Sequence, residues 1–423
     1  MTDMLSVEAA RAAVLERIQN LGTERVSIFD ALQRHTAIDV AALADNPPHD
    51  NSAMDGYAVR CQDIGNASAS TPTRLKVIED IPAGTVPQHV VGSGQASRIM
   101  TGAPVPEGAD AVIRVEDTRS DGDDVEILEP AEEVGENIRP RGEDMRAGET
   151  LIARGTRIGP GEIGVLATAQ HAFVTVARRP RIAILSSGDE LVEVGEPLRA
   201  GQIINSNTPA LAAMARACGA EPVILPIARD TEDAIRDSIV SALACDFVVS
   251  SGGVSVGEYD YVKKVLTDLG AEQILWRVAM KPGKPLFFCI LQDTPYFGLP
   301  GNPVSSLVSF LQFVQPAIGK ASGLPSANWE LPTSVATMEH DIYNRGDRRS
   351  FLRARLRISR AGHLVASTAH RAQGSHMITS MLGANGLVVL APKQRVTAGD
   401  SVTVQLVGDL VGDSEPDAPG GHD

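Results

Sequence analysis

The stretch Ser250-Ser251-Gly252-Gly253-Val254-Ser255-Val256-Gly257 decides the fold class of this 423-residue chain. It follows an apolar run, Cys245–Val249, that predicts a buried parallel strand, and it precedes a helical pattern over Tyr261–Leu269. A strand, a glycine-rich turn and a helix in this order indicate an α/β unit. The glycines leave backbone N–H groups exposed, so this loop can approach an anion closely. The alternative is a turn needed only for tight packing, because the loop matches neither the P-loop nor the dinucleotide pattern.

The α/β pattern continues on both sides of this loop. Further strands are predicted over Arg181–Leu185, Pro222–Pro226, Leu286–Ile290 and Tyr296–Leu299, and helices over Pro209–Cys218, Asp233–Leu243 and Asn302 to about Ile318. Asn207 or Thr208 is expected to cap the first of these helices. Residues 179–328 therefore predict an α/β domain with a mostly parallel sheet, and ligands bind such sheets at the carboxyl ends of their strands.

The remaining segments predict smaller parts around this domain. Residues 1–46 show helical spacing, and residues 147–178 are mixed and can pair with them in one N-terminal domain. Residues 47–146 contain short alternating runs between Gly/Pro turns, which predicts a β-rich insertion. Residues 329–408 alternate again and predict a small C-terminal β domain, whereas 409–423 predict a disordered tail rich in Asp, Pro and Gly.

Composition limits the classes of function. The formal net charge of −15 and the 4% aromatic content argue against a broad nucleic-acid surface or an anionic membrane surface. No apolar run approaches the length of a membrane span, and the N-terminus lacks the pattern of a signal peptide. The four cysteines show no zinc-ligand spacing, so a reduced chain in the cytoplasm is expected.

Three acidic residues, Glu190, Asp230 and Asp260, follow predicted strands. Carboxylates that converge on an anion site repel one another unless a cation lies among them, and Mg²⁺ prefers such ligands together with substrate phosphates. Their alternative role is to stabilise helix N-termini. Lys281 and Lys284 flank a Pro-Gly turn that can aim both ammonium groups at an oxyanion, although a solvated surface turn has the same composition.

Three further segments carry no chemistry that the residues alone reveal. These are Asp50–Ala58, Met100–Pro104 and Arg139–Asp144, for which structured turns or a solvated charge network are the ordinary interpretations. The sequence also shows no pairing of a nucleophile with a base in a known catalytic pattern.

Taken together, these segments resemble the molybdopterin molybdenumtransferase family, the MoeA and gephyrin E-domain type. The matching strings occur in family order and cover about residues 5–408. They are DNSAMDGYAV at 50–59, RIMTGAPVPEGADAV at 98–112, NIRPRGEDMRAGE at 137–149, LSSGDEL at 185–191, GQIINSN at 201–207, SSGGVSVGEYDYVK at 250–263, MKPGKP at 280–285, GLPGNPVSS at 298–306 and QGSH at 373–376.

The resemblance implies an elongated, multidomain subunit that forms a homodimer, with a central molybdopterin-binding α/β domain. It implies an enzyme that uses Mg²⁺ or another divalent metal to hydrolyse adenylylated molybdopterin and to join molybdate to its dithiolene, releasing AMP. Contacts with molybdopterin adenylyltransferase and with apo-molybdoenzymes are implied partners. The alternatives are a molybdopterin-binding scaffold, an adenylyltransferase, or a paralogue without transferase activity, and the choice between molybdate and tungstate stays open.

The resemblance also assigns residues by motif. The catalytic set is Asp55, Thr101, Asp144, Glu190, Asp230 and Asp260, of which Glu190, Asp230 and Asp260 are the expected metal ligands. The substrate-binding set is Ser251, Gly252, Gly253, Ser255, Arg277, Lys281, Lys284, Pro300 and Asn302. Asp55 and Thr101 are expected to reach the site across the dimer. Arg277 stands where some relatives carry Lys, which keeps the charge but changes the donor geometry.

Overall fold

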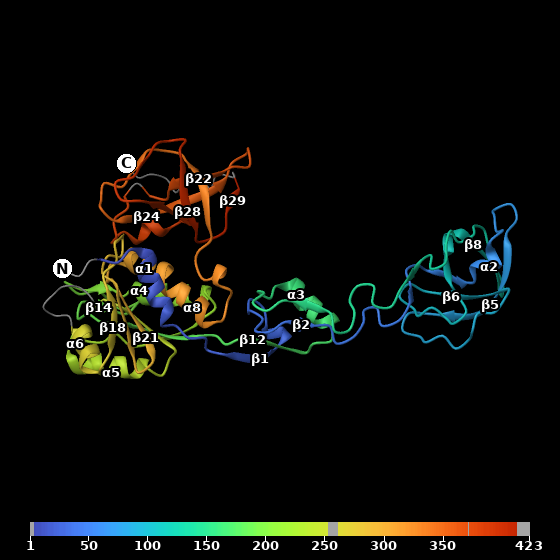
Figure 1. The fold of residues 1–423 in the computed structure, drawn as a ribbon, viewed down its shortest axis with the longest axis horizontal. Coiled ribbons are helices and arrows are strands. Elements are labelled where there is room, and N and C mark those ends of the chain that lie inside the picture. The colour runs from blue at the N-terminus through green and yellow to red at the C-terminus, as the bar shows by residue number, and fades with distance from the viewer. Residues whose placement is uncertain (1–3, 253–260, 371, 413–423) are drawn as a thin grey trace. The chain divides into compact units, whose positions relative to one another are not determined.

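The computed structural model describes residues 4–252, 261–370 and 372–412, which belong to two compact units. Unit 1 combines residues 1–24 with 177–423, and unit 2 consists of Arg25–Val176. Figure 1 shows the elements of both units. No helix among the described residues is long and apolar enough to cross a membrane.

The α/β domain of unit 1 is built on a six-stranded sheet of order β16-β13-β17-β21-β20-β18. Its strands are β13 (Arg181–Ser186), β16 (Glu221–Ile224), β17 (Phe247–Ser251), β18 (Glu272–Trp276), β20 (Phe287–Leu291) and β21 (Thr294–Leu299). Strands β16, β13, β17 and β21 pair in parallel, and β20 is antiparallel to both β21 and β18. The predicted mostly parallel sheet is confirmed. Strand β18 runs in the same direction as β21, so the loop after it also lies at the edge where the parallel strands end.

Helices cover both faces of this sheet, and their apolar faces pack into two separate cores, one on each side (Figure 1). Helices α5 and α6 pack on one face, and α1, α4, α7 and α8 pack on the other. The bounds are α4 (Asn207–Ala217), α5 (Glu232–Ala242), α6 (Tyr261–Asp268), α7 (Pro303–Ser309), a π-helical turn η3 (Phe310–Val314) and α8 (Gln315–Ala321). The expected cap of α4 is corrected: Ser206 is its N-cap, and Asn207 is already helical.

The N-terminal segment differs from the prediction. Helix α1 (Val7–Glu16) begins after Ser6, whose Oγ accepts from Ala9 N. Its buried face, Val7, Ala10 and Val14, joins the apolar core of the α/β domain, so residues 1–24 belong to unit 1. The helical pattern predicted up to residue 45 is wrong beyond this helix, because the chain continues as short strands.

The C-terminal β domain of unit 1 is a closed barrel with added strands. Strands β24, β25, β22, β28 and β26 pair in that order, and β26 pairs back to β24, while β19 and β29 both pair with β24. Their bounds are β19 (Met280–Lys281), β22 (Thr333–Met338), β24 (Arg349–Ile358), β25 (Leu364–Thr368), β26 (Gly386–Leu390), β28 (Ser401–Leu406) and β29 (Val411–Gly412), with β23 (Ile342–Tyr343) and β27 (Arg395–Val396) as a separate pair. The tail was predicted disordered from 409, yet β29 is paired with β24; residues 413–423 lie outside the described residues.

Unit 2 contains two groups of strands. Strands β1 (Thr23–Ser27) and β12 (Phe173–Ala177) pair, as do β2 (Val40–Ala41) and β11 (Thr150–Ile152), and they share an apolar core with α3 (Pro160–Thr168). The inserted segment forms a sheet of order β7-β4-β6-β5-β9-β8. Its strands are β4 (Gly56–Val59), β5 (Thr73–Ile81), β6 (Gln95–Ile99), β7 (Ala111–Arg114), β8 (Thr118–Asp121) and β9 (Asp124–Ile127), with α2 (Cys61–Ile64) beside them and β3 (Asn51–Ser52) paired to β10 (Ile138–Arg139).

Candidate functional site

Three loops meet where the parallel strands of the α/β domain end. Asn207, in the first turn of α4, donates through Nδ2 to Ser251 Oγ at 2.6 Å and to the carbonyl of Gly301 at 2.7 Å. Gly252 has a φ of +94°, and a Cβ there would come within 3.2 Å of the Ser187 carbonyl. Glycine is therefore required at the point where these loops approach one another.

The loops enclose a cavity of about 380 Å³, called here the loop cavity. It contains the predicted site residues Glu190, Ser251, Gly252 and Asn302, together with Asn207. Asn302 is the N-cap of α7 by position, but its side chain makes no capping hydrogen bond. The buried Asn207 Oδ1 also lacks a partner among the described residues. Uncommitted polar groups around a hollow of this kind are suited to hold a polar ligand.

Two acidic loops lie at the ends of the neighbouring strands β13 and β16. Asp189 N donates to Asp230 Oδ2 and Asp230 N donates to Asp189 Oδ1, both at 3.3 Å. Burial, and then the charges of Asp189 and Glu190, raise the pKa of Asp230 above its ordinary value. The Glu190 carboxylate folds against Gly188, where a Cβ would lie within 2.7 Å of its oxygen.

The donor set of these loops fits a hard divalent cation. Three carboxylates repel one another here, and a cation such as Mg²⁺, bound through one or two of them, would offset that repulsion. Among the described residues, no three His, Cys, Asp or Glu side chains are arranged to hold a metal ion by themselves. Asp260, the third expected ligand, lies outside the described residues, as do Gly253 and Ser255.

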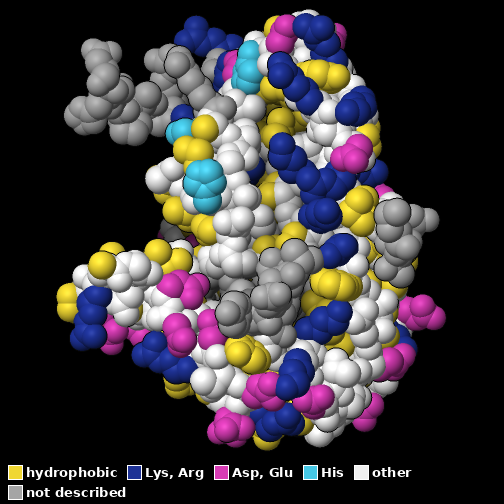
Figure 2. All heavy atoms as spheres, turned by 90° about the vertical axis from the view of Figure 1, so that its left-hand side faces the viewer, with side chains coloured by type: hydrophobic (Ala, Val, Ile, Leu, Met, Phe, Trp, Pro, Cys, Tyr) yellow, Lys and Arg dark blue, Asp and Glu magenta, His cyan; other side chains and the backbone are white. Residues whose placement is uncertain are grey.

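A second cavity of about 640 Å³ lies where the loop after β18 meets the C-terminal β domain, and it is called here the arginine cavity. Lys281, on β19, and Pro282 line it together with Arg345 and Arg353 of the C-terminal β domain. Residues 329–408 carry ten Lys and Arg against five Asp and Glu, in a chain of net charge −15. Lys and Arg side chains gather over the upper part of the face in Figure 2. This domain is thus a basic part of an acidic protein.

Arg353, on β24, is the feature of this cavity that the sequence did not reveal. It is 0% exposed, and Nε donates to Ser380 Oγ at 3.1 Å while Nη2 donates to the Gly374 carbonyl at 3.2 Å. Its Nη1 has no partner among the described residues, and no described carboxylate forms an ion pair with the guanidinium. Burial lowers the pKa of Arg353 to about 10. A buried guanidinium with a free N–H group is a ready donor for an anion.

The other predicted cations lie apart from the loop cavity. Lys281 and Lys284 are exposed, and no described side chain pairs with either ammonium group. Arg277 adopts a φ of +83° and stacks on Trp276, with its guanidinium carbon 4.5 Å from the ring centre. Pro300 is buried next to Gly301 and does not line the cavity. Of the predicted substrate-binding set, Ser251, Gly252 and Asn302 line the loop cavity and Lys281 lines the arginine cavity, whereas Arg277, Lys284 and Pro300 line neither.

The predicted residues of unit 2 form two separate contacts. Asp55 Oδ1 accepts from both the N–H and the hydroxyl of Thr101, each at 2.7 Å. The backbone N–H and then the hydroxyl of Thr101 lower the pKa of Asp55. Asp144 instead accepts from Asn46 Nδ2 at 2.9 Å. Asp55 and Thr101 thus form one exposed hydrogen-bonded pair that favours the ionised Asp55 carboxylate. Asp144 is not part of this pair.

Comparisons with known proteins identify the family and the fold of the chain. Family models match residues 5–169 as "MoeA N-terminal region (domain I and II)", 183–320 as "Probable molybdopterin binding domain" and 335–407 as "MoeA C-terminal region (domain IV)". A molybdopterin molybdenumtransferase of Nostoc sp. is 43% identical over 87% of this chain and 85% of its own length. That of Haemophilus influenzae is 36% identical over 97% of this chain and all of its own length. The crystal structure of a molybdopterin biosynthesis moea protein from Pyrococcus horikosii superposes with a TM-score of 0.83, at 32% identity over 96% of this chain and all of its own.

Proposed function

The chain belongs to the molybdopterin molybdenumtransferase family, and we propose that it inserts molybdate into adenylylated molybdopterin with release of AMP. The observation that carries this proposal is the pair of cavities in unit 1. One is lined by hydroxyl, amide and carboxylate groups, and the other by Lys281, Arg345 and Arg353 against a single carboxylate, Asp341, among its lining residues. Two anionic substrates can be held in two such cavities.

The loop cavity suits the adenylylated pterin. Ser251, Gly252 and Asn302 offer hydroxyl, backbone and amide groups to a ligand rich in hydrogen-bonding atoms. Glu190 and Asp230 would hold the divalent cation, which supplies charge neutralisation on the phosphate oxygens when it is bound. The residues themselves bind and orient the anhydride, so that water can attack it and AMP can leave.

The arginine cavity suits the tetrahedral oxyanion. Arg353, whose buried Nη1 has no partner among the described residues, and Lys281 both line this cavity, and both would pair with a doubly negative ligand. Desolvation makes the Arg353 interaction stronger than one at the surface. Molybdate bound there would form two Mo–S bonds with the dithiolene, while one of its oxygens leaves as water with the two thiol protons.

Several finer features belong to the same proposal. The active form is a homodimer in the cytoplasm, and Asp55 and Thr101 complete the site of the partner chain. Mg²⁺ is the expected cation. Molybdopterin adenylyltransferase is the expected donor of substrate, and apo-molybdoenzymes are the expected acceptors of the product. The support is the family membership together with the two cavities of unit 1.

The direct test is AMP release from adenylylated molybdopterin in the presence of Mg²⁺ and molybdate. The wild-type chain is expected to release AMP, and the release is expected to fall when molybdate or the cation is omitted. Folded wild-type protein that binds the substrate without releasing AMP would instead identify a scaffold or an inactive paralogue.

A further inference from the structure

A row of cations leads from the ligand edge of the parallel sheet to the arginine cavity. We call it the cation row, and its members are Lys263, Arg277, Lys284 and Lys281. Strand β18 ends at that edge, and Arg277 follows it directly. Arg277 N donates to the Leu286 carbonyl and Val278 N donates to the Lys284 carbonyl, each at 3.0 Å. Lys284 therefore lies beside the Arg277 segment, and Lys281, three residues earlier, lines the cavity.

Trp276, the last residue of β18, holds two members of the row. The Lys263 ammonium, from near the start of α6, lies 3.6 Å from the centre of its ring, and the Arg277 guanidinium carbon lies 4.5 Å from it. Cation–π attraction to the same indole offsets the repulsion between these two like charges. One aromatic side chain thereby keeps two cations together at the end of the strand.

The backbone of Arg277 is bent so that its side chain reaches this ring. Successive side chains of a strand point to opposite faces, so a regular strand would carry Arg277 away from Trp276. Arg277 instead has a φ of +83°, and its guanidinium lies on the ring of the residue before it. This left-handed conformation is unfavourable for a residue with a Cβ, and such conformations persist where the surrounding structure holds them, often at functional sites.

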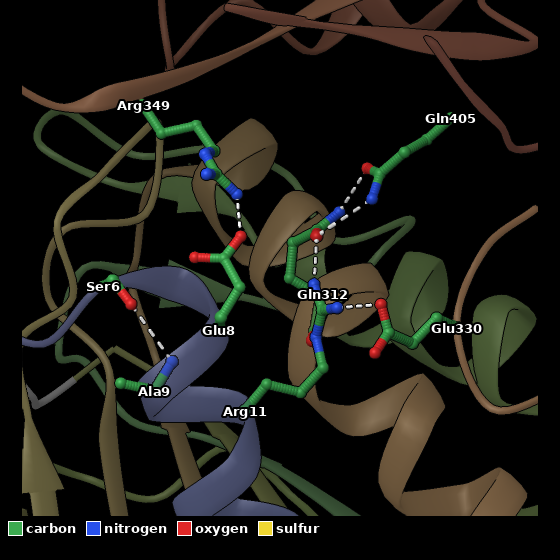
Figure 3. Close-up of polar contacts among 8 residues, drawn as sticks. All are labelled: Ser6, Glu8, Ala9, Arg11, Gln312, Glu330, Arg349 and Gln405. Atoms are coloured by element: carbon green, nitrogen blue, oxygen red, sulfur yellow. Dashed lines mark hydrogen bonds and ion pairs between the residues drawn. The ribbon is translucent and has the colours of Figure 1, made fainter. Parts of the chain in front are cut away.

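The described part of the chain does not neutralise the row. Its members other than Lys263 form no ion pair with a described carboxylate. The two arginines of a nearby interface between α1 and the C-terminal barrel are different, because Arg11 pairs with Glu330 and Arg349 pairs with Glu8 (Figure 3). Like charges that lie together without counter-ions create a local positive potential, here on a protein of net charge −15.

We propose that the cation row is an entry route, which captures a small divalent oxyanion and delivers it to the arginine cavity. This inference rests on the proposed function of that cavity, in which the oxyanion is molybdate. A net charge of −15 disfavours the approach of such an anion, and a local positive stretch raises its rate of association. Arg277 and Lys284, which line neither cavity, act during this approach. Trp276 is a positioning residue for Lys263 and Arg277.

The first experiment measures the potential at Trp276 itself. The Trp329→Phe variant leaves Trp276 as the only tryptophan of the full chain, and its fluorescence is quenched with iodide, caesium and neutral acrylamide at constant ionic strength. The same measurement is made after adding Lys263→Gln, Arg277→Gln and Lys284→Gln, which together define the row-neutral variant. We expect iodide quenching, relative to acrylamide, to fall about twofold in that variant and caesium quenching to rise. Unchanged ratios in folded protein would overturn the proposal.

The second experiment follows delivery, as AMP release at varied molybdate concentration. The matched control, Arg216→Gln/Arg236→Gln/Lys264→Gln, removes the same charge from helices α4, α5 and α6. At low ionic strength we expect the kcat/KM for molybdate to fall about tenfold in the row-neutral variant, with kcat unchanged and the control like wild type. Salt screens exposed charges, so about 0.5 M NaCl should reduce the difference to less than twofold.

The role of Trp276 is tested by two substitutions in the wild-type chain. Trp276→Phe keeps a ring for the two cations, whereas Trp276→Leu removes it. We expect a kcat/KM for molybdate near that of wild type in the first variant and about threefold lower in the second, with kcat equal in both. Equal losses in both variants would make Trp276 a packing residue.

Three results of the delivery experiment would overturn the entry route. They are a lower kcat with an unchanged KM for molybdate, a loss confined to the KM for adenylylated molybdopterin, and a difference that persists undiminished at high salt. If the wild-type chain releases no AMP, the proposed function fails and the entry route fails with it, even where quenching shows that the row is positive.

Discussion

At the scale of single residues, the site is marked by charges that the fold leaves uncompensated. Arg353 is buried without a carboxylate, and Asp230 lies beside two other carboxylates. Each is unfavourable for stability in the absence of ligand, because burying or crowding like charge costs free energy. Groups retained at such a cost are typical of binding sites, and each makes a prediction about stability.

Replacing Arg353 with Met is expected to raise or preserve thermal stability while abolishing stabilisation by molybdate. Because burial depresses the pKa to about 10, folding disfavours the charged form, and this cost applies at every pH below that value. Melting curves with and without molybdate test this, with Arg355→Met, exposed two residues along the strand, as the control. A variant that melts well below wild type, yet still responds to molybdate, would make Arg353 a structural residue.

Replacing Asp230 with Asn is expected to stabilise the protein at neutral pH when no divalent cation is present. The pKa of Asp230 in the folded protein lies above its ordinary value of 3.8. The contribution of this carboxyl to the free energy of unfolding is therefore fully present below pH 3.8, and it is lost as the pH rises through the folded pKa. Asn does not ionise, so the Asp230→Asn variant does not lose this stability at neutral pH.

Magnesium is then expected to raise the melting temperature of the wild type more than that of Asp230→Asn. Asp237→Asn, an exposed change on α5, is the matched control. If Asp230→Asn lowers stability without metal, the contact with Asp189 N outweighs the repulsion and the metal assignment loses its support.

At the scale of elements, the sequence predicts where strands and helices form better than it predicts which core each of them packs against. The strand predicted over Cys245–Val249, which spans Phe247–Ser251 in the structure, and the helix opening at Pro303 follow from local pattern and turn chemistry. Helix α1 was placed with the wrong domain, because an amphipathic stripe shows that a core exists but not which core. Arg353 was missed because an Arg inside a strand pattern predicts an outward-facing side chain, and only the tertiary structure buries it.

Asn207 is expected to determine how well the loop cavity is formed. The Asn207→Asp change keeps the size of the side chain but removes the donor that serves Ser251 and Gly301. Loss of two hydrogen bonds, together about 1.4 kcal/mol, should weaken the binding of adenylylated molybdopterin about tenfold. Equilibrium titration without metal measures the affinity for adenylylated molybdopterin. Unchanged affinity would show that the loops hold their positions without Asn207.

At the scale of the whole molecule, residues of both units are assigned to one reaction. Mixing Asp55→Asn chains with Arg353→Met chains at limiting molybdate, where each variant alone is expected to release little AMP, tests the composite site. If each site combines unit 2 of one chain with unit 1 of its partner, random pairing should restore about a quarter of wild-type AMP release. No recovery in mixtures that light scattering shows to be dimeric would place Asp55 and Arg353 in the same chain's site.

The most direct test of the central claim measures two products in one reaction. Wild-type protein is incubated with adenylylated molybdopterin, Mg²⁺ and molybdate, and both AMP and pterin-bound molybdenum are quantified. We expect them to appear in equal amounts, and Arg353→Met to lower the molybdenum yield at limiting molybdate. AMP released with no molybdenum in the pterin fraction, at saturating molybdate and with folded protein, would contradict the assignment of the arginine cavity to molybdate insertion.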